Sequence, residues 1–276
     1  MTTAAPQIRP NPALNTSADV LRDARAEWDY TEHADAYLAR PDYPAELLAQ
    51  LAGHTAVAPG KGRIVEVGAG TGNMTLGLAH LGSSYIAIEP NDAMRTWGQK
   101  RTSNLKAQWH KGTAEATTLS PSAADWIMAA QCFDTFEPQA AVAEMHRITA
   151  PGAHLTVLWN HRVWNEDPLE ATIERLIADR LGGYKRGVRR VDPSEALTVG
   201  GLFTDPVPME MPHSATMDPE RYVKVWRSVR TLRVQAGAEG FENLLTDIRR
   251  VIDQSGVRHI EVKYVCRSWT VRRVVH

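Results

Sequence analysis

The chain has 276 residues, and its formal charges nearly cancel, with 31 Lys and Arg against 32 Asp and Glu. A hydrophobic fraction of 43% and a charged fraction of 23% are typical of a folded globular protein. This composition excludes a disordered, collagen-like or fibrous chain. The near-zero net charge excludes a nucleic-acid-binding surface that covers the whole protein. The length allows one large domain with additions or two small domains.

Cysteine usage and the N-terminus indicate the compartment. Cys132 and Cys266 are too far apart to suggest a disulfide framework or a closely spaced pair of metal ligands. Residues 1–15 are rich in Ala, Pro and Thr and lack the apolar run of a signal peptide. No stretch approaches the roughly 20 apolar residues of a membrane-spanning helix. We therefore expect a cytoplasmic protein without a membrane partner or a metal site.

Short apolar runs alternate with helical patterns over most of the first 160 residues. Prolines break residues 1–17, which are predicted to be a loose arm. Alternating strands and helices predict parallel pairing through crossover helices, and therefore a doubly wound α/β sheet. The predicted strands are 64–67, 85–88, 126–129 and 155–159, and the predicted helices are 44–52, 73–81, one capped by Asn91, and 138–149.

The pattern changes after residue 159. Asp167, Pro168 and Glu170 predict a helix start, and Gly182-Gly183 predicts its end. The remaining predicted elements are a basic loop over 184–200, helices over 220–233 and 241–254, and a final strand over 262–270.

The most informative stretch is the glycine turn after the first predicted strand, in residues 65–73. Such a turn commonly holds a nucleotide-like ligand at the start of a helix. A dinucleotide fingerprint would need glycine at its sixth position, which is Asn73 here. Glu66 precedes the first glycine by two residues, where its charge would repel a pyrophosphate but suit a ligand with a positive amino group. A tight turn without a ligand is the plainer alternative.

The pattern Glu66-x-Gly68-x-Gly70-x-Gly72 resembles the first motif of the class I S-adenosylmethionine-dependent methyltransferases. The resemblance implies a Rossmann-like sheet of seven strands with the last one antiparallel, and S-adenosyl-L-methionine as the cofactor. It also implies an acid at the end of the second strand, where Glu89 stands. An ionised carboxylate can accept hydrogen bonds from both hydroxyls of a ribose.

Further segments extend the resemblance over roughly residues 28–160. Three of them are Gly112-Thr113-Ala114-Glu115, Gln131-Cys132-Phe133 and residues 145–152, the last of which is similar to the family pattern R-x-L-x-P-G. Two others, residues 33–44 and 158–160, are similar to segments of trans-aconitate methyltransferase-like proteins. The cofactor site that the resemblance implies consists of Tyr37, Arg40, Glu66, Gly68, Ala69, Gly70, Gly72, Asn73, Glu89, Pro90, Met94, Thr113, Ala114, Glu115, Gln131, Cys132 and Phe133.

Catalytic residues are less firmly indicated, because relatives in that branch often carry His and Trp where this chain has Asp134 and Thr135. The candidates are His161, as a base or a substrate contact, and Asp134, as a polar wall of the site. The plainer alternatives are a loop histidine bonded to the backbone and a helix cap. The candidate substrate residues are Tyr30, His33, Asn160, Trp226 and Arg230, although buried tryptophans more often belong to a core.

The N-terminal segment around Tyr37 and Arg40 is predicted to form a lid. Arg40 would pair with the methionine carboxylate or anchor the lid to a surface acid. Residues 221–276 contain 12 Lys and Arg against 5 Asp and Glu. This excess fits a solvated helix face or, as the sharper alternative, an arginine clamp on an anionic substrate. A nucleic-acid partner is not expected, because aromatic residues are not interleaved with the basic ones.

These observations predict three regions: an arm and lid (1–43), a cofactor-binding core (44–160), and substrate-cap helices with the remaining strands (161–276). The predicted function is methyl transfer from S-adenosylmethionine to a small molecule in specialised metabolism. The alternatives are cyclisation of S-adenosylmethionine, transfer of its aminocarboxypropyl group, and a non-catalytic cofactor-binding protein. The sequence is silent on oligomeric state.

Overall fold

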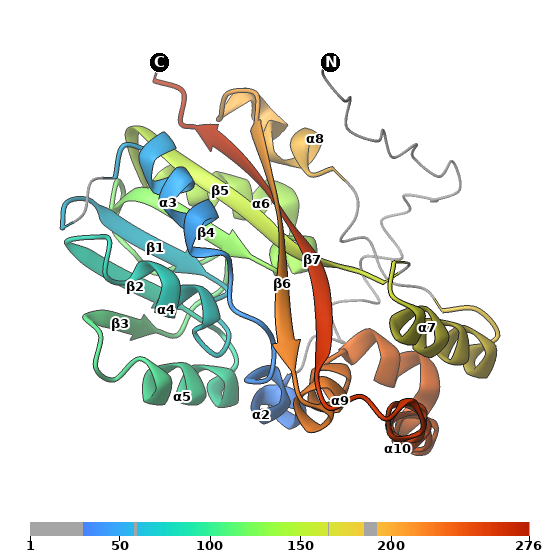
Figure 1. The fold of residues 1–276 in the computed structure, drawn as a ribbon. Coiled ribbons are helices and arrows are strands. Elements are labelled where there is room, and N and C mark those ends of the chain that lie inside the picture. The colour runs from blue at the N-terminus through green and yellow to red at the C-terminus, as the bar shows by residue number, and fades with distance from the viewer. Residues whose placement is uncertain (1–29, 58–59, 165, 185–191, 276) are drawn as a thin grey trace, which may run out of the picture.

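The computed structural model describes residues 30–57, 60–164, 166–184 and 192–275. Seven strands in these ranges form one sheet in the order β3-β2-β1-β4-β5-β7-β6 (Figure 1). The strands from β1 to β5 pair in parallel, and β7 runs antiparallel to both of its neighbours. The predicted α/β sheet with an antiparallel last strand is therefore confirmed. The predicted arm over residues 1–17 lies outside the described ranges.

The bounds of the elements are as follows. The strands are β1 (Arg63–Val67), β2 (Ser84–Ile88), β3 (Ala107–His110), β4 (Ala124–Ala130), β5 (Thr149–Val163), β6 (Val207–Met217) and β7 (Ile260–Arg272). The α-helices are α2 (Ala34–Tyr37), α3 (Ala45–His54), α4 (Asn73–Leu78), α5 (Asp92–Arg101), α6 (Pro138–Ile148), α7 (Pro168–Leu181), α8 (Ser194–Leu197), α9 (Pro219–Arg227) and α10 (Arg230–Ser255). Short 3-10 turns are η1 (Thr31–His33), η2 (Phe133–Thr135) and η3 (Val199–Gly201).

Helices cover both faces of the sheet, so its central strands are apolar on both sides. On one face, α3 and α4 pack buried side chains such as Leu47 and Leu78 around Ile64 of β1. On the other face, α6 packs Val142 against a cluster that includes Val65, the next residue of β1. Adjacent residues of one strand thus belong to opposite faces, as the two-residue period of a strand requires.

The helices α7, α9 and α10, called the cap here, form a third buried cluster. Its members include Ile177, Tyr222, Trp226 and Phe241. Figure 1 shows β6 and β7 running from the edge of the core toward these helices. Residues 30–43, called the lid here, lie between core and cap, because α2 contacts both α5 and α9.

Several predicted helix ends are confirmed. Asn91 accepts from the backbone N–H of Met94 at 3.0 Å, and Asp167 accepts from two backbone N–H groups at the start of α7. Gly182 ends α7 in the left-handed conformation, at φ 62°. None of the described helices is long and apolar enough to cross a membrane.

The C-terminal third departs from the predictions. The single helix predicted over 220–233 is wrong, because α9 ends at Arg227 and α10 begins at Arg230. Between them Ser228 turns its hydroxyl back to the carbonyl of Val225 at 2.6 Å, and Val229 is extended. The predicted loop 184–200 contains α8, which buries Leu197. The edge strand β6 was not predicted.

Candidate functional site

The loop between β1 and α4 is conformationally specialised. Gly68, Gly70 and Gly72 have φ angles of 72°, 58° and 82°, which an L side chain adopts only with strain. A Cβ at Gly68 would lie 2.7 Å from the Sγ atom of Cys132, and one at Gly70 would lie 3.3 Å from the Cε atom of Met94. Glycine at these points therefore keeps a backbone wall where side chains would otherwise collide.

Glu89 follows β2 and faces this loop. Its Oε2 atom accepts from the N–H of Gly70 and its Oε1 atom accepts from the N–H of Asn91, both at 2.8 Å. Burial raises the pKa of Glu89, and the two backbone N–H groups counteract that rise. A carboxylate has about four acceptor positions. Each oxygen of Glu89 thus retains the capacity to accept another donor from a ligand.

Glu66 lies on the interior side of the loop. Its Oε2 atom accepts from the Thr75 hydroxyl at 2.5 Å and the Tyr85 hydroxyl at 2.7 Å. Burial raises the pKa of Glu66 to about 7, although both hydroxyls favour the ionised form. Glu66 is not among the described residues that line the cavity beside the loop. Its predicted contact with a ligand amino group therefore stays a prediction.

A cavity of about 410 Å³ opens beside the glycine loop and Glu89. This size falls within the range of roughly 300–1,000 Å³ that is typical of small-ligand sites. Most of the predicted cofactor residues line it: Tyr37, Gly68, Gly70, Glu89, Pro90, Met94, Thr113, Ala114, Glu115, Gln131 and Cys132. Tyr30, which was predicted as a substrate residue, lines the same cavity.

The other predicted cofactor residues have different surroundings within the described part of the chain. Ala69 and Phe133 are buried in the two core clusters of the sheet. Gly72 stands at the start of α4 and donates its backbone N–H to the carbonyl of Ala69 at 2.9 Å. Asn73 accepts from Arg101 at 2.6 Å through its side-chain oxygen. These residues shape the loop from behind rather than line the cavity.

The lid is attached to the cap through Arg40. The guanidinium of Arg40 donates to the hydroxyl and carbonyl of Ser228 at 2.9 and 3.0 Å, and it lies 4.1 Å above the ring of Tyr37. Arg40 therefore anchors the lid, although to a serine and not to the predicted surface acid. Tyr30 and Tyr37 meet edge to face at the cavity, with ring centroids 5.8 Å apart.

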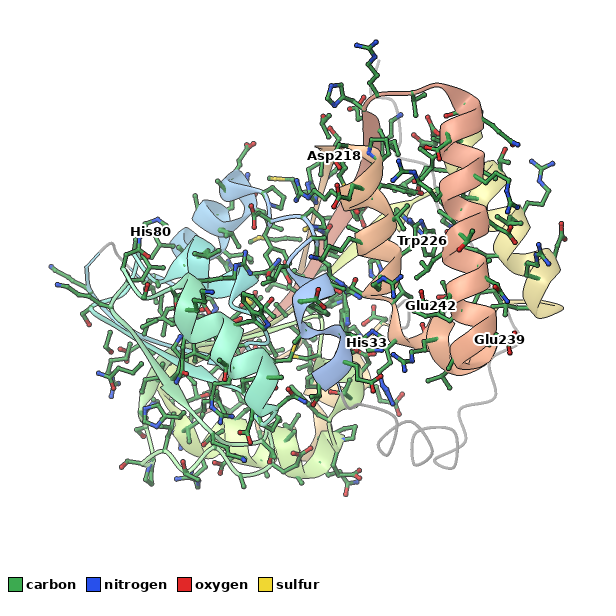
Figure 2. All side chains as sticks on the ribbon, turned by 90° about the horizontal axis from the view of Figure 1, so that it is seen from below. His33, His80, Asp218, Trp226, Glu239 and Glu242 are labelled. Carbon is green, nitrogen blue, oxygen red and sulfur yellow. The ribbon has the colours of Figure 1, made fainter. Side chains whose placement is uncertain are left out.

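His33 and the cap candidates belong to the packing between lid and cap. The Nδ1 atom of His33 lies 3.1 Å from the carbonyl of Arg227, and its ring meets Phe241 edge to face. Figure 2 shows His33 where the lid meets the cap helices that carry Trp226 and Glu242. Trp226 is 1% exposed, with the guanidinium of Arg162 at 3.8 Å above its ring. Among the described residues, His33, Trp226 and Arg230 do not line the cavity.

The catalytic candidates lie near the sheet but outside the described lining of the cavity. The side chain of Asp134 accepts from the Trp159 indole at 3.2 Å, and the helix cap at Glu137 is formed without Asp134. His161 pairs with Val265 in the ladder between β5 and β7, one residue beyond Asn160. Asn160 and His161 therefore face opposite sides of the sheet.

Sequence reasoning missed part of the wall that follows β4. Ala130, Thr135, Phe136 and Glu137 also line the cavity. Gln131 has a φ of 65°, which is uncommon for a residue other than glycine and often marks a functional site. Its side chain turns toward β5, with Nε2 at 3.5 Å from the carbonyl of Asn160. These residues directly follow a parallel strand, which is where ligands bind in such sheets, so their position could have identified them from the sequence.

The sheet order and the place of this cavity agree with what the resemblance to the class I S-adenosylmethionine-dependent methyltransferases implies. Residues 65–157 match the family model described as "Methyltransferase domain".

Two curated relatives are similar to part of the chain. An uncharacterized methyltransferase of Mycobacterium tuberculosis is 31% identical over 127 residues, which cover 45% of this chain and 48% of that protein. An uncharacterized methyltransferase of Schizosaccharomyces pombe is 31% identical over 154 residues, which cover 55% of this chain and 60% of that protein. The chain thus matches about half the length of these relatives.

Solved structures share the fold. A protein assigned as a type II methyltransferase from Anaeromyxobacter dehalogenans has a TM-score of 0.63 at 22% identity, over 86% of this chain and 99% of that one. The 4+2 cyclase SpnF has a TM-score of 0.51 at 17% identity, over 86% and 84% of the two chains. At these identities the likeness concerns the fold alone.

Proposed function

We propose that the protein transfers the methyl group of S-adenosylmethionine to a small-molecule acceptor. The observation that carries the proposal is the placement of Glu89 and the glycine loop on one cavity, with both oxygens of Glu89 anchored by backbone N–H groups. The matched methyltransferase domain supports the same chemistry. A cytoplasmic location and the absence of a nucleic-acid partner stay predictions of the sequence.

The donor half of the site follows from the cavity wall. Glu89 would accept from the two ribose hydroxyls, and the bare backbone at Gly68 and Gly70 would let the methionine portion approach closely. When bound, S-adenosylmethionine supplies a sulfonium that is already a good leaving group. The chain then has to hold the acceptor in line and exclude water. Tyr30 and Tyr37 of the lid line this cavity.

The anionic acceptor suggested by the basic C-terminal residues has less support. Arg227 pairs with Glu242 of α10 at 2.6 Å, Arg233 with Glu32 of the lid at 2.5 Å, and Lys224 with Asp35 of the lid at 3.5 Å. Side chains in such pairs are engaged by the protein itself. These ion pairs indicate that the basic side chains hold the lid and the cap together, and they speak against binding of an anionic acceptor by the same side chains.

A second candidate has a specific observation in its favour. The fold is shared with a protein named as a 4+2 cyclase, so the fold alone does not specify methyl transfer. Other uses of the same cofactor would need the same glycine loop and Glu89. The identity of the product, and not the affinity for the cofactor, separates these alternatives from methyl transfer.

Incubation with S-adenosylmethionine labelled in its methyl group and with a panel of small acceptors tests the proposal. We expect S-adenosylhomocysteine in amounts equal to the labelled acceptor, measured by mass spectrometry. Formation of methylthioadenosine would contradict methyl transfer and favour cyclisation or aminocarboxypropyl transfer. Tight cofactor binding without any product would favour a non-catalytic role.

A further inference from the structure

Strand β5 runs on beyond the point where its parallel neighbour ends. β4 ends at Ala130, which pairs with Leu158, whereas β5 continues to Val163. β7 pairs with this extension through to Val163, and β6 pairs with β7 alongside it. A three-stranded antiparallel wall therefore stands past the carboxyl edge of the parallel strands, which is the edge where ligands bind in such sheets.

Polar side chains gather on one face of this wall. Asn160 pairs with Cys266 of β7, and one row further Tyr264 of β7 pairs with His213 of β6. The Nε2 atom of His213 lies 2.9 Å from Oδ1 of Asn160, and Sγ of Cys266 lies 3.3 Å from the same oxygen. The ring of His213 stacks on Tyr264, with centroids 5.4 Å apart and planes 24° apart.

These contacts specify the protonation of the His213 ring. Burial raises the pKa of the Cys266 thiol to about 12, so the thiol keeps its proton and donates it to Asn160. The Asn160 atom that faces Cys266 and His213 is therefore the amide oxygen, which only accepts. We therefore assign Nε2 of His213, which lies 2.9 Å from this oxygen, as the N–H donor, and Nδ1 as the nitrogen with the lone pair. Burial lowers the pKa of His213, which keeps the ring neutral at pH 7.

One residue that lines the cavity also approaches this antiparallel wall. Gln131, which lines the cavity, approaches the carbonyl of Asn160 with its Nε2 atom at 3.5 Å. Tyr43 of the lid packs against the core cluster that contains Cys266. The polar cluster is thus linked through Asn160 to the wall of the donor cavity.

We propose that the wall formed by Asn160, Cys266 and His213 is the acceptor site, and that Nδ1 of His213 takes a proton from an acceptor hydroxyl. The inference rests on the proposed methyl transfer and assigns its second substrate to a class, that of small phenolic or enolic hydroxyls. The ring of His213 is half-buried and stacks on Tyr264, and the ring face turned away from Tyr264 suits a flat aromatic acceptor. His213 is the catalytic residue, and Asn160 is a positioning residue that fixes the imidazole tautomer.

The step balances without a further reactant. The acceptor oxygen forms a bond to the methyl carbon, the sulfur–carbon bond breaks, and its electron pair stays on sulfur. The hydroxyl proton moves to Nδ1 of His213, which becomes an imidazolium and releases the proton to water after the product leaves. A carboxylate acceptor has no such proton and would not use the base.

Nuclear magnetic resonance on the full chain saturated with S-adenosylhomocysteine tests the tautomer directly. The signals of His213 are assigned by their loss in His213→Gln. We expect an unprotonated Nδ1 at pH 7 and a pKa below 6.5, and a mixed tautomer in Asn160→Ala. Asn160→Asp, which retains the acceptor oxygen, should keep the tautomer and raise the pKa. A protonated Nδ1 in the wild type would overturn the proposal, whether or not any acceptor is turned over.

The pH profile has to be interpreted with the charged neighbours in view. Tyr264 and Cys266 of β7 face His213 directly. Arg162 of β5, Glu170 of α7, Arg40 of the lid and Arg221 of α9 act on Tyr264. Burial is the cause that lowers the pKa of His213, so a change in one of these groups should leave its tautomer in place.

Turnover with phenol, catechol, 4-hydroxybenzoate and benzoate tests the role in catalysis. We expect methylation of the hydroxyl probes that depends on His213, whereas methylation of the benzoate carboxylate should not depend on it. His213→Gln should lower kcat by roughly 10²–10⁴-fold, the usual contribution of a general base, with unchanged affinity for S-adenosylmethionine. The matched control is His80→Gln, which removes an exposed histidine far along the chain from the wall.

Two failures are distinguishable. If the wild type does not bind S-adenosylmethionine in calorimetry, the proposed function fails. If the wild type methylates a probe and His213→Gln does so equally well, with the same pH dependence of kcat, the assignment of His213 fails and the proposed function stands.

Discussion

Replacing Glu66 by glutamine removes a buried negative charge and keeps an oxygen for Thr75 and Tyr85. The pKa of Glu66 rises from 4.5 to about 7 on folding, with burial as the main cause. The folded state therefore binds the proton more tightly than the unfolded state. The stability that this proton contributes is complete below pH 4.5 and is lost as the pH rises through about 7.

The size of the effect follows from that pKa. At 1.36 kcal/mol per pKa unit, the rise corresponds to roughly 3 kcal/mol in the free energy of unfolding. Because Glu66 is only 2% exposed, solvent screening reduces this figure little. The free energy of unfolding of Glu66→Gln, relative to that of the wild type, should thus increase by about 3 kcal/mol as the pH rises from 4.5 to 8.

Urea unfolding of both proteins at pH 4.5, 6, 7 and 8, without ligand, measures the difference. Glu46→Gln, at an exposed position of α3, is the matched control. A stability difference between Glu66→Gln and the wild type that stays constant from pH 4.5 to 8 would refute the reasoning. So would an equal pH dependence in the control.

Two further variants test the cavity wall. Gly68→Ala should destabilise the fold by at least about 1–2 kcal/mol in urea unfolding, the cost of a left-handed alanine, and adding Cys132→Ala should recover only the part due to the sulfur contact. Gly53→Ala, in a helix with open space around it, should be neutral or stabilising, and an equal loss there would count against the argument. Glu89→Gln should weaken S-adenosylmethionine binding by roughly 1.5–3 kcal/mol in calorimetry, the usual worth of hydrogen bonds to a charged group. The control for Glu89 is Asp92→Asn on the neighbouring helix, and unchanged affinity in Glu89→Gln would remove Glu89 from the site.

The donor side of the cavity could be predicted because its signals are local. Gly68 and Gly70 need left-handed backbone, and Glu89 ends a short apolar run, so a few adjacent residues carry both the structure and the chemistry. The two-residue period of β1 also contains a signal that was not used. Glu66 follows Val65 and shares the face of Ile64, which is a buried face, so its inward orientation could have been inferred.

The proposed acceptor side could not be predicted, because long-range pairing brings its residues together. Pro208 and Pro212 interrupt the apolar pattern of β6, and prolines of this kind are tolerated only on an edge strand, so the strand was missed. His213 then meets Asn160 across 53 residues of sequence, and Arg40 meets Ser228 across 188. No local pattern reports either contact.

Isothermal titration of the wild-type chain with S-adenosylmethionine and S-adenosylhomocysteine tests the central claim most directly, namely that the cavity beside Glu89 holds the methyl donor. We predict saturable binding of both ligands at one site per chain, weakened in Glu89→Gln and unaffected in Asp92→Asn. No binding of either ligand to the folded wild type, or binding that Glu89→Gln leaves unchanged, would contradict the account.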